Sequence, residues 1–370
     1  MLTALVNGTF FTGKEEITGK ALLIEDGILK GWTEAVSIPR EAQTTDLKGY
    51  NISAGLLDLQ IYGGGGLLFS DDPSAVALQT MADGLVRTGT TGFLITLATN
   101  SIQLFEKAID VVRENPHPAV LGLHLEGPYI NPEKRGAHII EHIKKPERKE
   151  VEALLQRAAG VIKMMTLAPE MCDPEIIRLL LDNGVIVSAG HSNATFDEAA
   201  RGFELGIQTS THLFNAMSPL HHRDTGLPGA VYQSPSACAS IIPDGIHVDF
   251  QALNISKKMM GKRLFLITDA VEESANPSAY THIRQQDRFT LPDGTLSGSA
   301  ITMLQGIRNC VEKAGIPLPE ALRMASLYPA KLMNMPGRGE ITIGHKANLT
   351  IFDQDFSPVA TYVNGVGYNQ

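Results

Sequence analysis

Three residues of the types that bind catalytic metals occur in separate, distinctive motifs. Glu126 lies in HLEGP, His191 in SAGHSNAT and His212 in THLFNAM. One carboxylate and two imidazoles form the protein ligand set of an open catalytic zinc site, in which water holds the remaining position. Any one of these residues alone is more often structural. Together they predict a metal site, provided that the fold brings them to one place.

A fourth residue, Asp269 in the motif TDA, adds a proton acceptor to this set. Water bound to a divalent metal has its pKa lowered towards 7, so a neighbouring carboxylate can take its proton and then pass it to a leaving group. The alternative interpretation is that Thr268 and Asp269 cap a helix. The pattern favours metal-assisted hydrolysis with Asp269 as the acid and base.

The elements that must position these residues are short β-rich runs that alternate with longer stretches of helical period, a pattern that indicates parallel βα units. Eight such units close a (β/α)8 TIM-like barrel, in which active residues lie at the carboxyl ends of the strands. The four candidate residues end the third, fifth, sixth and eighth runs. The predicted runs are Leu56–Ile61, Gly92–Leu97, Val120–Leu125, Ile162–Leu167, Val185–Ala189, Ile207–His212, Cys238–Ile242 and Leu264–Thr268.

The segments between these runs contain residues that are typical of helix ends. Thr195 is a predicted N-cap, with Glu198 three residues later as in a capping box and Gly206 at the other end. A further helix is predicted near Leu318–Leu332, after the eighth unit.

The two ends of the chain have a different pattern from its middle. Residues 1–50 and 336–370 contain short strands separated by turn signals such as Val363-Asn364-Gly365, which is typical of a hairpin. We therefore predict a small β-sandwich domain formed by both chain termini, with residues 51–335 inserted as the catalytic barrel.

Composition excludes several classes of protein. The chain has 370 residues, with 31 basic and 40 acidic side chains and a net charge of −9. No basic field that would hold nucleic acid or anionic lipid is expected. No apolar run approaches the ~20 residues that span a bilayer, and the start of the chain lacks the basic region of a signal peptide. Three scattered cysteines argue against a disulfide framework, so a cytoplasmic location is predicted.

Over its whole length the chain resembles the N-acetylglucosamine-6-phosphate deacetylases of the amidohydrolase superfamily. The resemblance rests on HLEGP, SAGHSNAT, THLFNAM, DGIHVD, TDA and LSGSAITM in combination. It implies hydrolysis of N-acetyl-D-glucosamine 6-phosphate to D-glucosamine 6-phosphate and acetate, a step of amino-sugar catabolism. It also implies one divalent metal ion per subunit, Zn²⁺ with Fe²⁺, Co²⁺ or Mn²⁺ as alternatives, on Glu126, His191 and His212, and a homodimer in which Arg223 could reach the partner's site.

The resemblance assigns roles to further residues. His138 would polarise the acetyl carbonyl or steady the oxyanion, whereas without the resemblance it reads as an exposed loop histidine. Arg223 and His247 would hold the sugar phosphate, and a guanidinium does match phosphate geometry. The alternative for Arg223 is a solvated surface cluster. The rest of the ligand would be held by Ala137, Asn215, Ala216, Ile301, Thr302 and Met303.

One departure from the wider superfamily concerns the number of metals. Many two-metal members carry His-x-His at the end of the first strand, where this chain has Gln60-Ile61-Tyr62. Neutral Gln and phenolic Tyr are poor replacements for imidazole ligands, so we predict that the second metal position is lost. His124, two residues before Glu126, is expected to support the site rather than to bind metal.

Three other functions fit part of the pattern. A deacetylase of an epimeric N-acetylhexosamine 6-phosphate would need the same catalytic groups. A catalytically silent interaction protein with this fold could dispense with Glu126, His191, His212 and Asp269. A sugar-phosphate binding module would explain Arg223 and His247 and would leave the metal ligands without a use.

Overall fold

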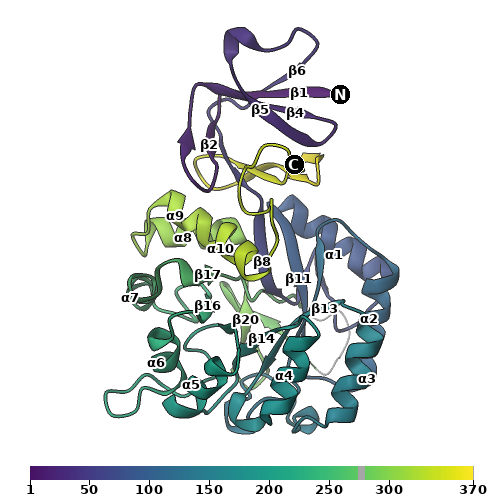
Figure 1. The fold of residues 1–370 in the computed structure, drawn as a ribbon, viewed down its shortest axis with the longest axis vertical. Coiled ribbons are helices and arrows are strands. Elements are labelled where there is room, and N and C mark those ends of the chain that lie inside the picture. The colour runs from purple at the N-terminus through teal and green to yellow at the C-terminus, as the bar shows by residue number, and fades with distance from the viewer. Residues whose placement is uncertain (274–279, 370) are drawn as a thin grey trace.

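The computed structural model describes residues 1–273 and 280–369. The chain forms a barrel of parallel strands surrounded by helices, with a smaller β domain stacked at one end that contains both termini (Figure 1). The predicted α/β barrel architecture is confirmed.

The barrel strands pair in parallel with their neighbours in chain order. The predicted strands recur at closely similar positions, except that the sixth is reduced to two paired residues because only Thr209 and Ser210 match partners on both sides. The strands are β8 (Leu56–Ile61), β11 (Thr90–Ala98), β12 (Val120–Glu126), β13 (Ile162–Leu167), β14 (Ile186–Ala189), β15 (Thr209–Ser210), β16 (Cys238–Ile241) and β17 (Leu264–Leu266).

Helices cover the outside of the barrel and pack apolar faces against its strands. The capping box predicted at Thr195 is present, because Glu198 bonds reciprocally with the start of the helix. The helices are α1 (Ala75–Arg87), α2 (Ile102–Glu114), α3 (Arg148–Ala158), α4 (Pro174–Asp182), α5 (Phe196–Glu204), α6 (Gly226–Gln233), α7 (Phe250–Met260) and α8 (Met303–Glu312).

The helix predicted near residues 318–332 is two helices, α9 (Leu318–Met324) and α10 (Leu327–Leu332). Pro329 has no backbone N–H, and its ring would clash with the carbonyl four residues earlier in a continuous helix. The chain therefore ends α9 and starts again after Ser326, which places Pro329 in the first turn of α10.

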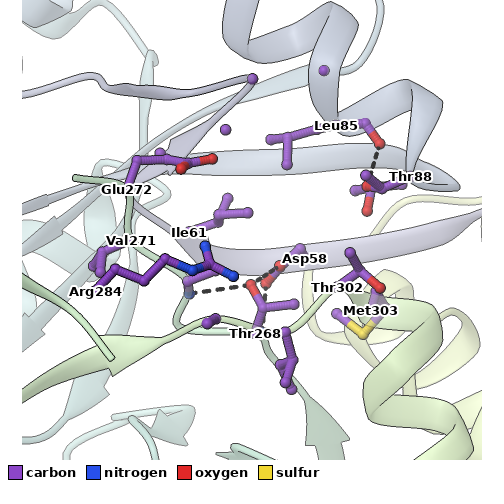
Figure 2. A pocket seen from close by; sticks show the side chains of 18 residues that line it. Asp58, Ile61, Leu85, Thr88, Thr268, Val271, Glu272, Arg284, Thr302 and Met303 are labelled. Atoms are coloured by element: carbon purple, nitrogen blue, oxygen red, sulfur yellow. Dashed lines mark hydrogen bonds between the residues drawn. The ribbon is translucent and has the colours of Figure 1, made fainter. Parts of the chain in front are cut away.

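The barrel closes between its first and eighth units by a seam rather than by a regular ladder. The hydrogen-bonded order of strands runs from β17 to β8, and the residues that follow β17 bond to β8. Asp269 N donates to Gln60 O at 3.0 Å, and Tyr62 N donates to Ala270 O at 2.9 Å. Deeper in the seam, the Asp58 carboxylate accepts hydrogen bonds from Thr268 (Figure 2).

Three short strands form an antiparallel excursion between β17 and α8: β18 (Ile283–Arg284), β19 (Arg288–Thr290) and β20 (Leu296–Ser299). A small hairpin of β9 (Gly63–Gly64) and β10 (Leu67–Leu68) follows β8. Ser299 N donates to Asp269 O at 3.0 Å, so β20 lies beside the end of the eighth barrel unit.

The small domain contains two sheets over a core of its own, which includes Leu22, Ile52 and Leu349. One sheet orders β5 (Ile28–Glu34), β4 (Lys20–Glu25), β1 (Leu2–Val6) and β6 (Gln43–Asp46). The other orders β23 (Val366–Asn369), β22 (Pro358–Val363), β21 (Leu349–Phe352), β7 (Asn51–Ala54), β2 (Thr9–Phe11) and β3 (Glu16–Ile17).

Strand β7 bears on the predicted domain limits. It lies just beyond residue 50 yet pairs with β2 and β21 of the terminal sheet. The division into residues 1–50 with 336–370 and residues 51–335 stays a prediction, and this pairing favours a first boundary about four residues later.

No helix among the described residues is long and apolar enough to cross a membrane.

Candidate active site

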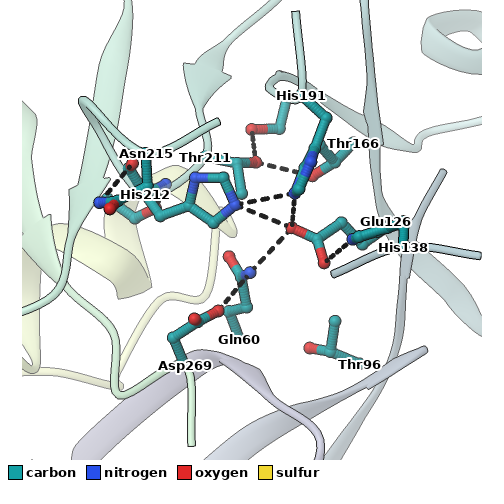
Figure 3. Close-up of polar contacts among 12 residues, drawn as sticks. Gln60, Thr96, Glu126, His138, Thr166, His191, Thr211, His212, Asn215 and Asp269 are labelled. Atoms are coloured by element: carbon teal, nitrogen blue, oxygen red, sulfur yellow. Dashed lines mark hydrogen bonds and ion pairs between the residues drawn. The ribbon is translucent and has the colours of Figure 1, made fainter. Parts of the chain in front are cut away.

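The three predicted metal ligands meet at the carboxyl ends of their strands. Glu126 ends β12, and His191 and His212 follow β14 and β15. The Nε2 atoms of His191 and His212 lie 3.2 and 3.1 Å from Glu126 Oε1, and 3.1 Å from each other (Figure 3). All three side chains are buried. The structure thus confirms that these side chains come together, each with a donor atom within 4.8 Å of the others.

The protonation pattern of these groups fits a divalent metal. His191 Nδ1 lies 2.9 Å from Lys134 O, a pure acceptor, so Nδ1 donates to that carbonyl and Nε2 is directed at Glu126. Burial lowers the pKa of His212, which favours a neutral imidazole. Burial alone would raise the pKa of Glu126, but the imidazoles of His191 and His138 hold it well below its usual range. A carboxylate and two imidazole nitrogens are a suitable donor set for Zn²⁺.

The backbone at three of these strand ends lies in the left-handed region. The φ angles are +47° at His191, +33° at His212 and +55° at Asp269. A residue with a Cβ adopts this conformation at a cost of roughly 1–3 kcal/mol and keeps it only where its surroundings enforce it. The fold therefore holds these side chains over the barrel mouth at the expense of some stability.

Asp269 is tied to the ligand group by Gln60. The Gln60 amide Nε2 donates to Asp269 Oδ1 at 2.7 Å and to Glu126 Oε1 at 3.0 Å (Figure 3). The hydroxyl of Tyr62 donates to the other carboxylate oxygen of Glu126. Burial, together with the negative charge of Glu126, raises the pKa of Asp269 well above its usual value. A raised pKa suits a carboxyl group that must accept a proton and later return it.

His138 is buried in the site and is not an exposed loop residue. Thr99 N donates to its Nδ1 at 3.2 Å, so Nδ1 is an acceptor and the proton lies on Nε2. His138 Nε2 is 3.1 Å from Glu126 Oε2. Burial and the neighbouring His191 lower the pKa of His138 to about 4, so a neutral imidazole presents an N–H donor to the site.

His124 lies beneath the ligand group and does not join it. Its ring nitrogens are 3.0 Å from Leu59 O and 2.7 Å from Thr166 Oγ1. These bonds connect β12 to β13 and, across β11, to β8, which agrees with the supporting role expected from the sequence.

A cavity of about 250 Å³ opens over these groups. His247 lines it with Nδ1 held 2.5 Å from Asp244 Oδ2, which leaves Nε2 for a ligand. The predicted substrate residues Ala137, Asn215 and Ala216 also line it. The lining further includes residues that the sequence analysis did not select: Tyr62, Gly136, Thr295, Leu296, Ser297 and Gly298.

Residues 51–367 match the model of the amidohydrolase family. The chain belongs to the amidohydrolase family. It is 35% identical to the N-acetylglucosamine-6-phosphate deacetylase of Haemophilus influenzae, over 99% of both chains. It is 32% identical to the N-acetylgalactosamine-6-phosphate deacetylase of Shewanella sp. strain ANA-3, over 93% of this chain and 90% of the other.

Among solved structures, this amidohydrolase is similar to the N-acetylglucosamine-6-phosphate deacetylase from Pasteurella multocida. The TM-score is 0.95 and the sequence identity 37%, over the whole of both chains. The similarity covers the small β domain as well as the barrel, so the whole architecture is shared.

Four predicted substrate residues lie elsewhere in this amidohydrolase. Arg223 is exposed on the loop before α6, where its Nε donates to His222 Nε2 at 3.2 Å. Ile301, Thr302 and Met303 line a separate cavity at the barrel seam (Figure 2).

The chain path explains the position of residues 301–303. Thr302 caps α8 by accepting from Gln305 N, so the chain has already turned away from the strand ends. Residues 295–298 face the site instead. The motif LSGSAITM covers residues 296–303 and so includes all but the first residue of the segment that faces the site, whereas the prediction selected the last three residues of the motif.

Proposed function

We propose that this amidohydrolase hydrolyses the acetamide of N-acetyl-D-glucosamine 6-phosphate, giving D-glucosamine 6-phosphate and acetate. The observation that carries the proposal is the joint presence of the three metal ligands, the Asp269 carboxylate and the His138 N–H donor around one cavity. Similarity over nearly full length to the relatives of that name supports the choice of substrate.

Each residue of the site has a separate role in amide hydrolysis. A divalent metal held by Glu126, His191 and His212, zinc or otherwise Fe²⁺, Co²⁺ or Mn²⁺, would supply Lewis-acid chemistry at water and at the acetyl carbonyl. Asp269 accepts the proton of the attacking water. His138 Nε2–H donates to the carbonyl oxygen as negative charge develops on it. Asp269 then protonates the departing sugar amine, which is too basic to leave as an anion.

A direct test measures acetate release from three compounds: the 6-phosphates of N-acetylglucosamine and N-acetylgalactosamine, and unphosphorylated N-acetylglucosamine. We expect N-acetylglucosamine 6-phosphate to react with the highest kcat/KM of the three. Preference for the galactose epimer would support the second candidate, which the similarity to the Shewanella protein favours. If the metal-loaded protein released no acetate from any of the three compounds, this result would contradict the proposed deacetylase activity.

The purified protein is expected to hold one tightly bound divalent metal per chain. Gln60 and Tyr62 occupy the place where a second metal would need ligands, and both already bond to Glu126. Elemental analysis after gel filtration measures the number of metals. Two retained equivalents, both required for activity, would contradict this prediction.

Recognition of the phosphate calls for a cation beside the cavity. None of the described residues that line the cavity is a lysine or an arginine. We propose that the protein is a homodimer and that the exposed Arg223 reaches the site of the second copy. This proposal rests on the position of Arg223 outside its own cavity and on the resemblance to the deacetylases.

Arg223→Ala is then expected to weaken capture of the phosphorylated sugar by on the order of 1.5–3 kcal/mol, the range for a charge-assisted bond. The loss should appear mainly in KM, because the phosphate is remote from the amide. Arg223→Lys, which keeps the charge but not the paired donors, should lose less. Equal loss towards unphosphorylated N-acetylglucosamine would exclude Arg223 as a phosphate ligand.

A further inference from the structure

Asp58 is a fully buried carboxylate to which the proposed reaction gives no task. It lies within β8 with no exposed surface. It accepts hydrogen bonds from Thr268 Oγ1 at 2.5 Å and from Thr268 N at 3.2 Å (Figure 2). A third hydrogen bond comes from Gln60 N at 3.3 Å. Burial raises the pKa of Asp58 to about 7, against the opposing effect of these bonds. Two of the three bonds hold the residue that precedes Asp269.

Thr268 makes further hydrogen bonds, which can form only while it stays in this position. Its Oγ1 accepts from Ala270 N at 3.3 Å, and its carbonyl accepts from Ser299 Oγ at 2.5 Å. Asp269 N donates to Gln60 O at 3.0 Å. The backbone on both sides of Asp269 is therefore held by β8 and β20.

These bonds matter because Asp269 has a strained backbone. Its φ of +55° lies in the left-handed region, which a residue with a Cβ leaves unless its surroundings prevent it. If Thr268 were released, rotation of the chain towards an ordinary φ would turn the Asp269 carboxylate away from Gln60 Nε2, now 2.7 Å distant.

Packing is incomplete at the same place. Asp58 and Thr268 both line a cavity of about 120 Å³ that lies at the seam and also touches Leu85 and Met303 (Figure 2). Side chains next to open space can move without a steric penalty. The hydrogen bonds of Asp58, rather than close packing, must hold Thr268 on this side.

We propose that Asp58 is a positioning residue, which fixes Thr268 and thereby keeps the Asp269 carboxylate in proton-transfer geometry. The inference rests on the proposed function only in that Asp269 must be the proton acceptor. Asp58 contacts neither the cavity over the metal ligands nor any of those ligands, so its effect on the reaction passes through the backbone.

The test uses two pairs of variants in the metal-loaded, full-length protein. Asp58→Ala removes all the acceptors, whereas Asp58→Asn keeps an oxygen for the two backbone donors. Thr268→Val removes the hydroxyl at nearly constant volume, and Thr268→Ser keeps it. Displacement of a catalytic group by about 1 Å can cost roughly 100-fold in rate. We expect kcat to fall 10- to 100-fold in Asp58→Ala and Thr268→Val, with KM and metal content near those of the parent.

The conservative member of each pair should recover most of that loss. A crystal structure of Asp58→Ala should show the Asp269 carboxylate displaced from Gln60, and this readout does not depend on the identity of the substrate. If the parent releases no acetate, the proposed function fails while the structural readout still tests the positioning. If Asp58→Ala does not fold, Thr268→Val tests the same contact. Values of kcat within threefold of the parent, or a loss explained by missing metal, would overturn the inference.

Discussion

Replacing Asp269 with Asn is expected to reduce turnover by about 10²–10⁴-fold, the usual effect of removing a general acid and base. The change keeps the volume of the side chain and its hydrogen-bonding shape, but an amide does not accept a proton near neutral pH. Substrate should still bind, because His138, His247 and the three metal ligands keep their positions around the cavity. Steady-state kinetics should therefore show a collapse of kcat with a nearly constant KM.

Metal content must be measured in the same preparation, since the loss of Asp269 could disturb the neighbouring ligand Glu126 through their shared partner Gln60. Asp72→Asn, at an exposed carboxylate that pairs with Lys107, is a matched control and should behave like the parent. Turnover of Asp269→Asn within a few-fold of the parent, at full metal occupancy, would mean that another group carries the proton.

Removal of the metal is expected to abolish activity and to lower the melting temperature. The three candidate ligands come from three different strands, so a bound ion would link β12, β14 and β15 at their carboxyl ends. A ligand present at about 100 times its dissociation constant stabilises the folded state by about 2.7 kcal/mol. Chelator-treated protein should lose acetate release and melt at a lower temperature, and one equivalent of a divalent ion should restore both.

His212→Ala should resemble the chelated protein and should not be rescued at the same metal concentration. Loss of a group that merely supports a ligand already costs roughly 10–100-fold in metal affinity, and loss of a ligand should cost more. His345→Ala changes an exposed imidazole in the small domain and serves as the control. Full activity of thoroughly metal-free protein would overturn the proposed mechanism.

Much of the candidate active site could be predicted from the sequence because strand order determines where strands end. In a parallel barrel all carboxyl ends lie at one edge, so the residues that end the third, fifth, sixth and eighth runs must come near one another. Glu126, His191, His212 and Asp269 do so, and contacts within 3.3 Å connect them directly or through Gln60. No knowledge of loop paths was needed for this conclusion.

The environment of each residue was harder to predict. His138 alone in a loop sequence suggests exposure, but Thr99 and Glu126 bury it. The exact extent of the short strands was also not encoded locally. In strand β15 only Thr209 and Ser210 pair with the two neighbouring strands, β14 and β16.

By itself, the sequence determined the alternation of strands and helices, the turns of the terminal domain and the set of chemically active residues, because these depend on local periodicity and on residue type. Only the tertiary structure decided that Gln60 bridges Glu126 and Asp269, that Asp58 holds Thr268, and that residues 295–298 rather than 301–303 face the cavity. The Gln60 and Asp269 side chains are separated by 209 positions in the chain. Contacts of this kind arise only when the first and last barrel strands meet at the seam, and no local pattern in either strand specifies the partner that the other supplies.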